Sequence, residues 1–354
     1  MNRNHATARS GAWTGTSIDE IRKVPKADLH VHLAGCIPAT VVKELLQEAP
    51  PAIGIESSLD LSVLPILGPV PSLVHYLHAW NLLDQLPRGQ ARLQRIFQSV
   101  LSDFQADGVV YAEFRHSPWR VVKLNNIALE TALTWSLTAL EDAKASVPGI
   151  DPRIIFGINR ANFDLPAIRE LLHAYKSLGS PWQIVGLDVA GDEAAHPIGD
   201  DLARVICTAA DELGFGVTIH AGETGPADNV RYAIEVCGAT RIGHGLAAVQ
   251  SGPILELARR RNVSFEVCLP SNVLTSCVSS LREHPVLKLI ERQVPFVLCT
   301  DNPGVHAFSL SQEYQQFHAF TGRGDILEAM LKRQTGVAFS RHSPSAATVD
   351  STSR

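Results

Sequence analysis

Eight short apolar runs, each followed by a longer polar and amphipathic stretch, constrain the fold of this 354-residue chain more than any other feature. Near-continuous apolar runs are typical of strands that are buried on both faces, and their alternation with helices is typical of a parallel sheet. The runs predict strands at 27–33, 109–115, 153–159, 184–190, 216–222, 241–245, 263–269 and 295–301.

Helical periodicity fills the segments between the later runs. Val230, Ala233, Ile234 and Cys237 follow the i, i+3, i+4, i+7 spacing of one helix face, and segments 253–261 and 284–293 have similar patterns. The alternation predicts an α/β fold, namely a (β/α)8 TIM barrel. An open, doubly wound sheet is the main alternative, but the chain lacks the glycine-rich phosphate turn that is usual there.

The stretch between the first two predicted strands is long for one connection and contains a Pro- and Gly-rich segment at 50–73. It predicts an inserted helical and loop segment after the first strand, which forms either a lid over the barrel mouth or a plain surface excursion. Residues 1–20 and 340–354 have few large apolar side chains, so we expect disordered tails on either side of a single domain at 21–339.

Charge, hydrophobicity and cysteine content argue against several classes of protein. The chain has 31 basic and 36 acidic residues and no basic block, which argues against a nucleic acid polymer as partner. It has no apolar run of about 18 residues and no secretory signal at its start, so we expect neither membrane insertion nor export. Six scattered cysteines without a C-x-x-C pair favour a reduced, cytoplasmic protein.

Polar residues gather where the predicted strands end, which in such a barrel is the active-site face. His30 and His32 are two residues apart on a strand, so their side chains point to the same face. Further polar residues lie at the ends of the fifth, sixth and eighth strands: His220, Glu223, His244, Asp301 and Asn302. Three imidazoles with one carboxylate suit Zn²⁺, with Fe²⁺ or Mn²⁺ as alternatives. The motifs H-x-E with P-C-x-x-C and H-E-x-x-H are absent, which excludes those two zinc classes.

The ordered motifs PKADLHVHLAG, VVYAEFRHSP, VGLDVAGDE, VTIHAGETG, RIGHG and TDNP resemble those of the adenosine deaminase family within the amidohydrolase superfamily. The resemblance covers about residues 25–320. It implies a (β/α)8 barrel, one zinc ion per chain, and hydrolytic removal of an amino group from a purine-like ring.

The resemblance also implies roles for individual residues. His30, His32, His220 and Asp301 match the zinc ligands, and Asp301 also counts as catalytic. Glu223 matches the proton donor to the ring nitrogen, His244 the residue that orients and helps to deprotonate the attacking water, and Gly191 the backbone contact to the ring. Such a metal lowers the pKa of its water from 15.7 to about 7.

Two positions depart from the family pattern and concern substrate recognition. Ala34 replaces an acid that contacts the ribose 5′-hydroxyl, and Asn302 replaces a second Asp. We therefore expect a small aminopurine-like substrate other than plain adenosine, such as a modified 6-aminopurine nucleoside or a related amino-heterocycle. The alternatives are an amide or ester hydrolase of the same superfamily and a non-catalytic binding barrel; the oligomeric state stays open.

Overall fold

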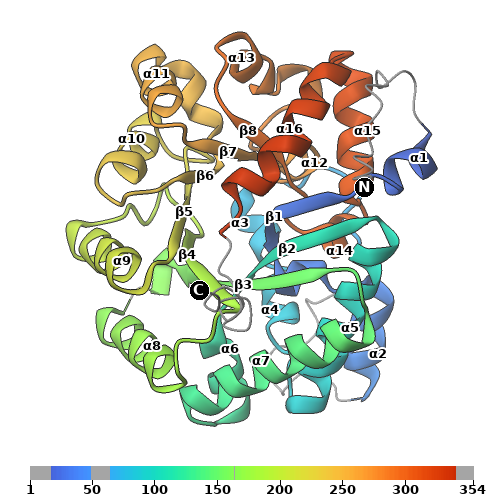
Figure 1. The fold of residues 1–354 in the computed structure, drawn as a ribbon, viewed down its shortest axis with the longest axis vertical. Helices are drawn as coiled ribbons and strands as arrows, with labels where there is room; N and C mark the ends of the chain where they lie inside the picture. The colour runs from blue at the N-terminus through green and yellow to red at the C-terminus, as the bar shows by residue number, and fades with distance from the viewer. Residues whose placement is uncertain (1–16, 49–63, 163, 340–354) are drawn as a thin grey trace, which may run out of the picture.

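Eight parallel strands form one sheet in chain order and close into a barrel (Figure 1). The computed structural model describes residues 17–48, 64–162 and 164–339. Between the last and first strands, Asp301 N donates to His30 O at 2.8 Å and His32 N donates to Asp301 O at 2.9 Å. The predicted (β/α)8 TIM barrel is confirmed. The strands are β1 (Lys26–His32), β2 (Val109–His116), β3 (Asp151–Asn159), β4 (Ile184–Ala190), β5 (Gly216–Ala221), β6 (Arg241–His244), β7 (Ser264–Val267) and β8 (Phe296–Leu298).

The last four strands end earlier than the sequence predicts. The backbone turns into the left-handed region at Gly222 (φ 69°), at His244 (φ 61°) and at Asp301 (φ 61°), and such residues cannot continue a strand. After β7 the chain enters a short helix at Leu269. Glu223, Asp301 and Asn302 therefore lie beyond the strands, whereas His220 and His244 lie within β5 and β6.

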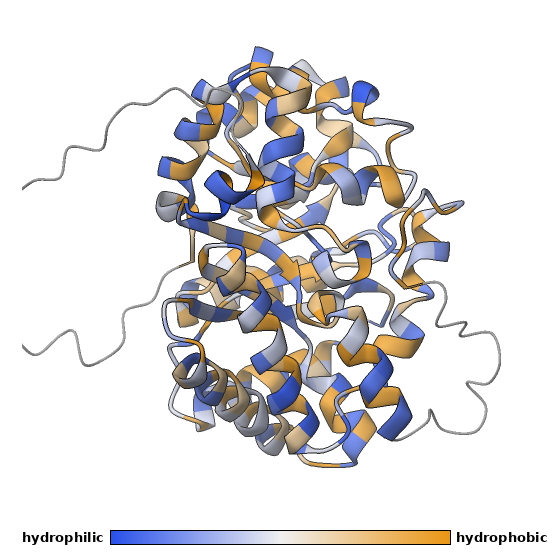
Figure 2. Cartoon of the chain, turned by 90° about the vertical axis from the view of Figure 1, so that its right-hand side faces the viewer, coloured by the Kyte–Doolittle hydropathy of each residue, from blue (hydrophilic) through white to orange (hydrophobic). Residues whose placement is uncertain are grey.

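Helices surround the barrel, and hydrophobic and hydrophilic residues alternate along them (Figure 2). Those that follow the strands are α5 (Gln90–Ala106), α6 (Pro118–Asn125), α7 (Leu129–Ser146), α8 (Leu165–Ser177), α9 (Asp200–Leu213), α10 (Ala227–Glu235), α11 (Gly252–Arg260), α12 (Leu269–Leu274), α13 (Val286–Glu291), α14 (Pro303–His306), α15 (Leu310–Thr321) and α16 (Gly324–Val337). Short 3₁₀ helices are η1 (Leu33–Cys36), η3 (Arg160–Asn162), η4 (Leu246–Gln250) and η5 (Leu281–Glu283).

The insertion after β1 carries α2 (Ala39–Glu48), α3 (Leu73–Leu77) and α4 (Trp80–Leu83). Most of its Pro- and Gly-rich part, at 49–63, lies outside the described residues. Of the predicted tails at 1–20 and 340–354, residues 1–16 and 340–354 also lie outside them. The end of the predicted N-terminal tail belongs to α1 (Ile18–Arg22), which a capping box between Ser17 and Glu20 initiates and which buries Ile21.

The barrel interior holds a layer of buried charges below the strand ends. Glu113, Arg115, Asp188, Arg241 and Glu266 are between 0% and 3% exposed. Ion pairs of Arg115 and Arg241 join strands that are not neighbours, namely β2 with β4, β2 with β7 and β6 with β2, so these pairs cross the interior.

The opposite end of the barrel is closed by Phe339. Its ring lies where a Cβ on Gly216 would stand, and it also approaches Gly186. The Arg241 guanidinium lies 3.6 Å from the centre of the same ring, which is a cation–π contact. Glycine at both strand positions is therefore what allows the aromatic ring to cover the barrel floor.

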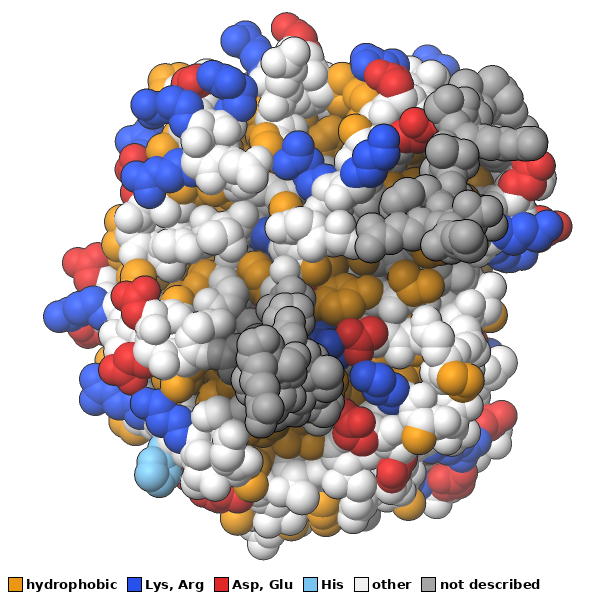
Figure 3. All heavy atoms as spheres, viewed as in Figure 1, with side chains coloured by type: hydrophobic (Ala, Val, Ile, Leu, Met, Phe, Trp, Pro, Cys, Tyr) orange, Lys and Arg blue, Asp and Glu red, His pale blue; other side chains and the backbone are white. Residues whose placement is uncertain are grey.

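Basic and acidic side chains are interspersed on the face shown in Figure 3. Within the described residues, none of the helices combines the length and the apolar character that crossing a membrane requires.

Candidate active site

The four predicted metal ligands meet at the ends of β1, β5 and β8. His32 Nε2 lies 3.3 Å from His220 Nε2, and Asp301 Oδ1 lies 3.4 Å from His32 Nε2 and 3.6 Å from His30 Nε2. The side chain of His32 is 21% exposed, whereas that of His30 is fully buried. The cluster therefore opens to solvent on the His32 side.

Carboxylates behind the cluster fix the orientation of two of these imidazoles. Glu266 Oε2 lies 2.7 Å from His30 Nδ1, and Asp188 Oδ1 lies 3.0 Å from His220 Nδ1. A carboxylate only accepts, so each Nδ1 carries the proton and each Nε2 presents a lone pair to the cluster.

These residues fit a metal ion. His30 Nε2 is buried and has no hydrogen-bond partner, which is costly for a lone pair unless a cation takes it up. Imidazole nitrogens converging with one carboxylate oxygen are a donor set that transition metals and zinc prefer. We therefore expect His30, His32, His220 and Asp301 to hold the ion.

Arginines keep the supporting carboxylates ionised. Arg115 bonds both Asp188, at 2.9 Å, and Glu266, at 2.6 Å, and Arg241 lies 2.7 Å from Glu266 Oε1. Burial by itself raises the pKa of Glu266, but the two guanidiniums outweigh it and hold that pKa well below its usual range. The Nδ1–H groups of His30 and His220 therefore face carboxylates that stay ionised and can only accept hydrogen bonds.

Glu223 lies beside the cluster on the turn after β5. Its side chain is 6% exposed, and its Oε1 lies 3.6 Å from His244 Nε2. Burial, followed by the charges of Asp301 and Glu193, raises the pKa of Glu223 to about 8. The carboxyl group is therefore suited to hold a proton at neutral pH.

A single buried carboxylate anchors the turn that carries Glu223. Glu193 accepts from the backbone N–H groups of Gly222, Thr224 and Gly225 at 2.8, 2.8 and 2.9 Å, and from Asn229 Nδ2 at 3.0 Å. A Cβ on Gly225 would stand 2.9 Å from Glu193 Cδ, so glycine permits this close approach. The backbone is thereby held in place at Gly222, before Glu223, and at Thr224 and Gly225, after it.

The predicted substrate contacts lie at the same end of the barrel. Gly191 follows β4 with φ 105°, a backbone conformation that favours glycine. Asn302 is 2% exposed, and its Oδ1 has no hydrogen-bond partner. Ala34 lies in η1, directly after β1, and borders a small cavity of about 40 Å³ that His116 and Arg120 also line.

The insertion after β1 reaches the open side of the cluster. The Trp80 ring stands edge-on to His32, with 6.5 Å between the ring centres, and Tyr76 packs 5.3 Å from Trp80. Tyr76 Oη also lies 2.6 Å from His306 Nε2, which ties α3 to α14. This contact favours the lid interpretation of the insertion over a plain surface excursion.

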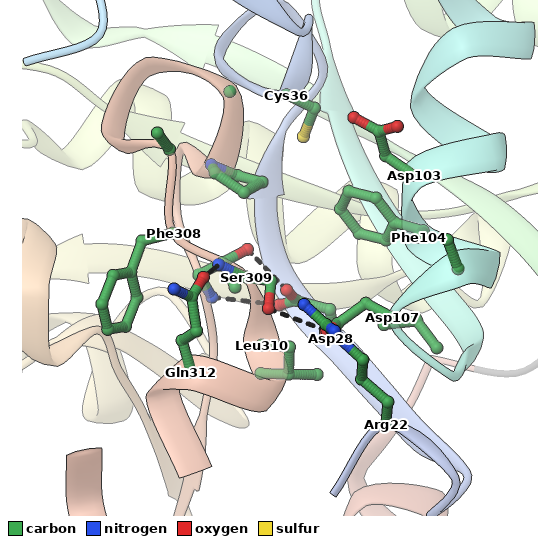
Figure 4. A pocket seen from close by; sticks show the side chains of 16 residues that line it. Arg22, Asp28, Cys36, Asp103, Phe104, Asp107, Phe308, Ser309, Leu310 and Gln312 are labelled. Carbon is green, nitrogen blue, oxygen red and sulfur yellow. Dashed lines mark hydrogen bonds and ion pairs between the residues drawn. The ribbon is translucent and has the colours of Figure 1, made fainter. Parts of the chain in front are cut away.

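A larger cavity of about 400 Å³ lies apart from this cluster, between α1, α5 and the start of α15 (Figure 4). No predicted site residue lines it. Its carboxylate Asp107 already accepts from Ser309 Oγ and Ser311 N, both at 2.8 Å. The cavity touches the imidazole cluster through Asp28, which lines it and accepts from His30 N at 3.4 Å.

The structure brings together the seven polar residues that the sequence predicts. The residues that support them by hydrogen bonds and ion pairs were not predicted. Asp188 and Glu266 were detectable as single charges inside the apolar runs IVGLDVA and VSFEVCL. Glu193 stands in the quoted motif VGLDVAGDE, two residues after Gly191. Asn272 and His284, which follow β7, gave no signal because neither lies at a predicted strand end.

The adenosine deaminase family model matches residues 25–337. The chain belongs to the adenosine deaminase family. It is 33% identical over 298 residues to an adenosine deaminase of Edwardsiella ictaluri, covering 83% of this chain and 86% of that one. It is 29% identical over 314 residues to an adenosine deaminase of Clostridium kluyveri, covering 88% of each.

Solved structures share the fold. An amidohydrolase of Burkholderia ambifaria with bound Zn has a TM-score of 0.80 at 24% identity, covering 95% of this chain and 93% of that one. The N6-methyl-AMP deaminase of Arabidopsis thaliana has a TM-score of 0.76 at 23% identity, covering 92% and 95%. Family membership makes the protein a hydrolase of C–N bonds that deaminates an amino-heterocycle, which argues against the amide or ester hydrolase and the non-catalytic barrel.

Proposed function

We propose that the protein is a zinc-dependent aminohydrolase that replaces the exocyclic amino group of a 6-aminopurine nucleoside, or a related amino-heterocycle, and releases ammonia. The observation that carries this proposal is the buried Glu223 carboxyl group beside the imidazole cluster, 3.6 Å from His244. A protonated acid next to a metal site is what deamination of a ring requires, because the ring nitrogen gains electrons as water adds.

Zinc is the metal that the donor set and one solved structure favour. The ion would supply Lewis acidity that lowers the pKa of a water molecule. His30, His32, His220 and Asp301 would hold it, with Glu266 and Asp188 orienting two of the imidazoles. The Burkholderia amidohydrolase with bound Zn supports this choice over Fe²⁺ or Mn²⁺.

The side chains around the cluster then account for the proton transfers. Water oxygen adds to the amino-bearing carbon, and Glu223 delivers a proton to the adjacent ring nitrogen and regains one from the water. The remaining hydroxyl proton passes to the amino group as the C–N bond breaks, which yields ammonia and a ring carbonyl. His244 orients the attacking oxygen.

Substrate recognition is where this chain departs from its family. The Ala34 side chain cannot hydrogen-bond a 5′-hydroxyl, so a substrate gains nothing there from an unmodified ribose. The Gly191 backbone and the Asn302 amide remain available to contact the ring nitrogens. We therefore propose a substrate with a changed 5′ group, or with no sugar, in preference to plain adenosine.

An ammonia-release screen of the zinc-loaded protein tests the proposal. It covers aminopurines, their nucleosides and nucleotides, N6-substituted and 5′-modified forms, and aminopteridines. We expect at least one to be turned over, with kcat lowered about 10²- to 10⁴-fold in Glu223→Gln at unchanged metal content. Adenosine turnover with a kcat/KM near 10⁶ M⁻¹s⁻¹, within the range of about 10⁴ to 10⁸ for efficient enzymes, would contradict the substrate assignment.

The double variant Ala34→Asp, Asn302→Asp is the matched test of recognition. It restores both family side chains without touching the proposed ligands. We expect its kcat/KM for adenosine to rise relative to that for the best substrate of the screen. An unchanged ratio would mean that neither position sets specificity.

A further inference from the structure

We propose that Asn272 and His284 are positioning residues that place the proton of neutral His244 on Nε2, so that His244 acts on the reacting oxygen as a hydrogen-bond donor and not as a base. The inference rests on the proposed function, because it assigns His244 its part in deamination. It replaces the expectation that His244 helps to deprotonate the attacking water.

One group at the start of α13 has a fixed role as a hydrogen-bond donor. The backbone N–H of Val286, at the first residue of α13, donates to His284 Nδ1 at 3.1 Å. A backbone N–H only donates, so His284 Nδ1 presents a lone pair, and the proton of a neutral His284 sits on Nε2. His284 is neutral because burial lowers its pKa to about 3.

The next contact fixes the orientation of an amide. His284 Nε2 lies 3.2 Å from Asn272 Oδ1, so the N–H of the imidazole donates to the amide oxygen. The amide nitrogen of Asn272 then points the other way, 3.0 Å from His244 Nδ1. The Asn272 side chain cannot be turned round, because its NH₂ group would then face the Nε2–H of His284.

The last contact assigns the proton of His244. An amide NH₂ only donates, so His244 Nδ1 accepts, and the single proton of the neutral ring lies on Nε2. His244, Asn272 and His284 are 2%, 0% and 3% exposed, so water does not compete for these contacts. The chain of hydrogen bonds thus runs from the start of α13 to the end of β6.

This proton has two consequences at the cluster. Ligand atoms of His30, His244 and Asp301 lie within 4.8 Å of one another, so geometry alone offers His244 as a metal ligand. A nitrogen that carries a proton has no lone pair for a metal, which leaves His244 outside the ligand set. The same nitrogen cannot take a proton from water, but it can donate to the oxygen that attacks the ring.

The variant Asn272→Asp tests whether His244 acts as a hydrogen-bond donor or as a base. The two amino acids have nearly the same shape, but both carboxylate oxygens accept, so one takes the Nε2–H of His284 and the other requires a proton on His244 Nδ1. The lone pair of His244 Nε2 then faces the cluster. If His244 is a donor, kcat falls about 10²- to 10³-fold, the usual cost of one lost donor to a developing charge, with KM changed only a few-fold. Retained or increased kcat would show that His244 acts as a base and would overturn the proposal.

Asn125→Asp is the matched control, because Asn125 is also a hydrogen-bonded amide. It accepts from Gly89 N and donates to Pro87 O and Val121 O, and it contacts none of the residues of the cluster. We expect its kcat to match the wild type. A comparable fall in kcat in this variant would mean that any such amide-to-acid change disturbs the enzyme and would overturn the interpretation of Asn272→Asp.

A second readout needs no substrate. In protein labelled with ¹⁵N-histidine, NMR shows which imidazole nitrogen carries the proton, and the His244 signals are identified by their loss in His244→Gln. We expect Nε2–H in the wild type and Nδ1–H in Asn272→Asp; Nδ1–H in the wild type would overturn the assignment. Because this measurement is independent of turnover, failure of the ammonia screen would refute the proposed function without affecting the assignment of the proton.

Discussion

Glu193→Gln probes how the enzyme holds its proposed acid in place. The wild-type carboxylate accepts four hydrogen bonds, two on each oxygen, from the turn around Glu223 and from Asn229. Glutamine keeps one oxygen, but its NH₂ group confronts the two donors on the other side. A hydrogen bond to a charged group contributes about 1.5–3 kcal/mol, so two lost bonds set an upper limit of about 3–6 kcal/mol on the local stability of the turn.

Relaxation of the turn and entry of water reduce this cost, and we expect about 3 kcal/mol. At 1.36 kcal/mol per factor of ten, the amide hydrogens at 222–225 should exchange about 10²-fold faster than in the wild type. A displacement of Glu223 by about 1 Å should lower kcat by a similar factor of about 10². Hydrogen exchange read by mass spectrometry, together with steady-state kinetics on the best substrate of the screen, measures both effects.

Asp192→Asn is the control for this experiment. Asp192 is the neighbouring carboxylate and also accepts from two backbone N–H groups, those of Ala194 and Ala195, but it does not contact the Glu223 turn. We expect it to leave exchange at 222–225 and kcat unchanged. Wild-type exchange and kcat in Glu193→Gln would refute the anchoring role, and loss of metal would show that Glu193 supports the ligand His220 instead.

Three further predictions concern the metal, the pH dependence of stability and the barrel floor. His30→Ala should weaken metal binding by more than the roughly 10- to 100-fold that loss of an outer-shell partner costs, and an unchanged dissociation constant in a metal titration would contradict the ligand assignment. His284 has a pKa of about 3 in the folded protein and of about 6.5 in the unfolded chain, so between these pH values the unfolded chain binds more protons and the free energy of unfolding falls as the pH is lowered. Denaturant titrations should show a shallower fall with pH in His284→Gln, and an identical slope would contradict the pKa shift. Phe339→Ala should lower the free energy of unfolding by about 2 kcal/mol, with Phe339→Leu losing less because it keeps apolar contacts; wild-type stability in Phe339→Leu would mean that ring contact with Arg241 contributes nothing.

The barrel and the position of the site were accessible from the sequence because both depend on local patterns. Apolar runs buried on both faces have a characteristic composition, and polar residues such as His220 and Asp301 stand out where those runs end. The ends of β7 and β8 were misplaced because they depend on backbone turns, as at Asp301, rather than on hydrophobicity.

The partners of the site residues were not accessible in the same way. The contact of His30 with Glu266 spans 236 positions of sequence, and that of Asn272 with His244 spans 28. No periodicity links such residues, since they meet only after the strands have closed into a barrel. The orientation of a side chain, and with it the place of a proton, therefore had to come from the structure.

The buried ions beneath the imidazoles do more than support them, because their charges do not cancel. Glu113, Asp188 and Glu266 carry three negative charges, whereas Arg115 and Arg241 carry two positive ones, so this layer keeps one negative charge in excess. Asp301 adds a second above it. Two fixed negative charges are neutralised by one divalent ion, whereas a monovalent ion leaves a charge uncompensated in a medium of low dielectric constant. The charges of these six residues thus favour a divalent over a monovalent ion at the proposed site.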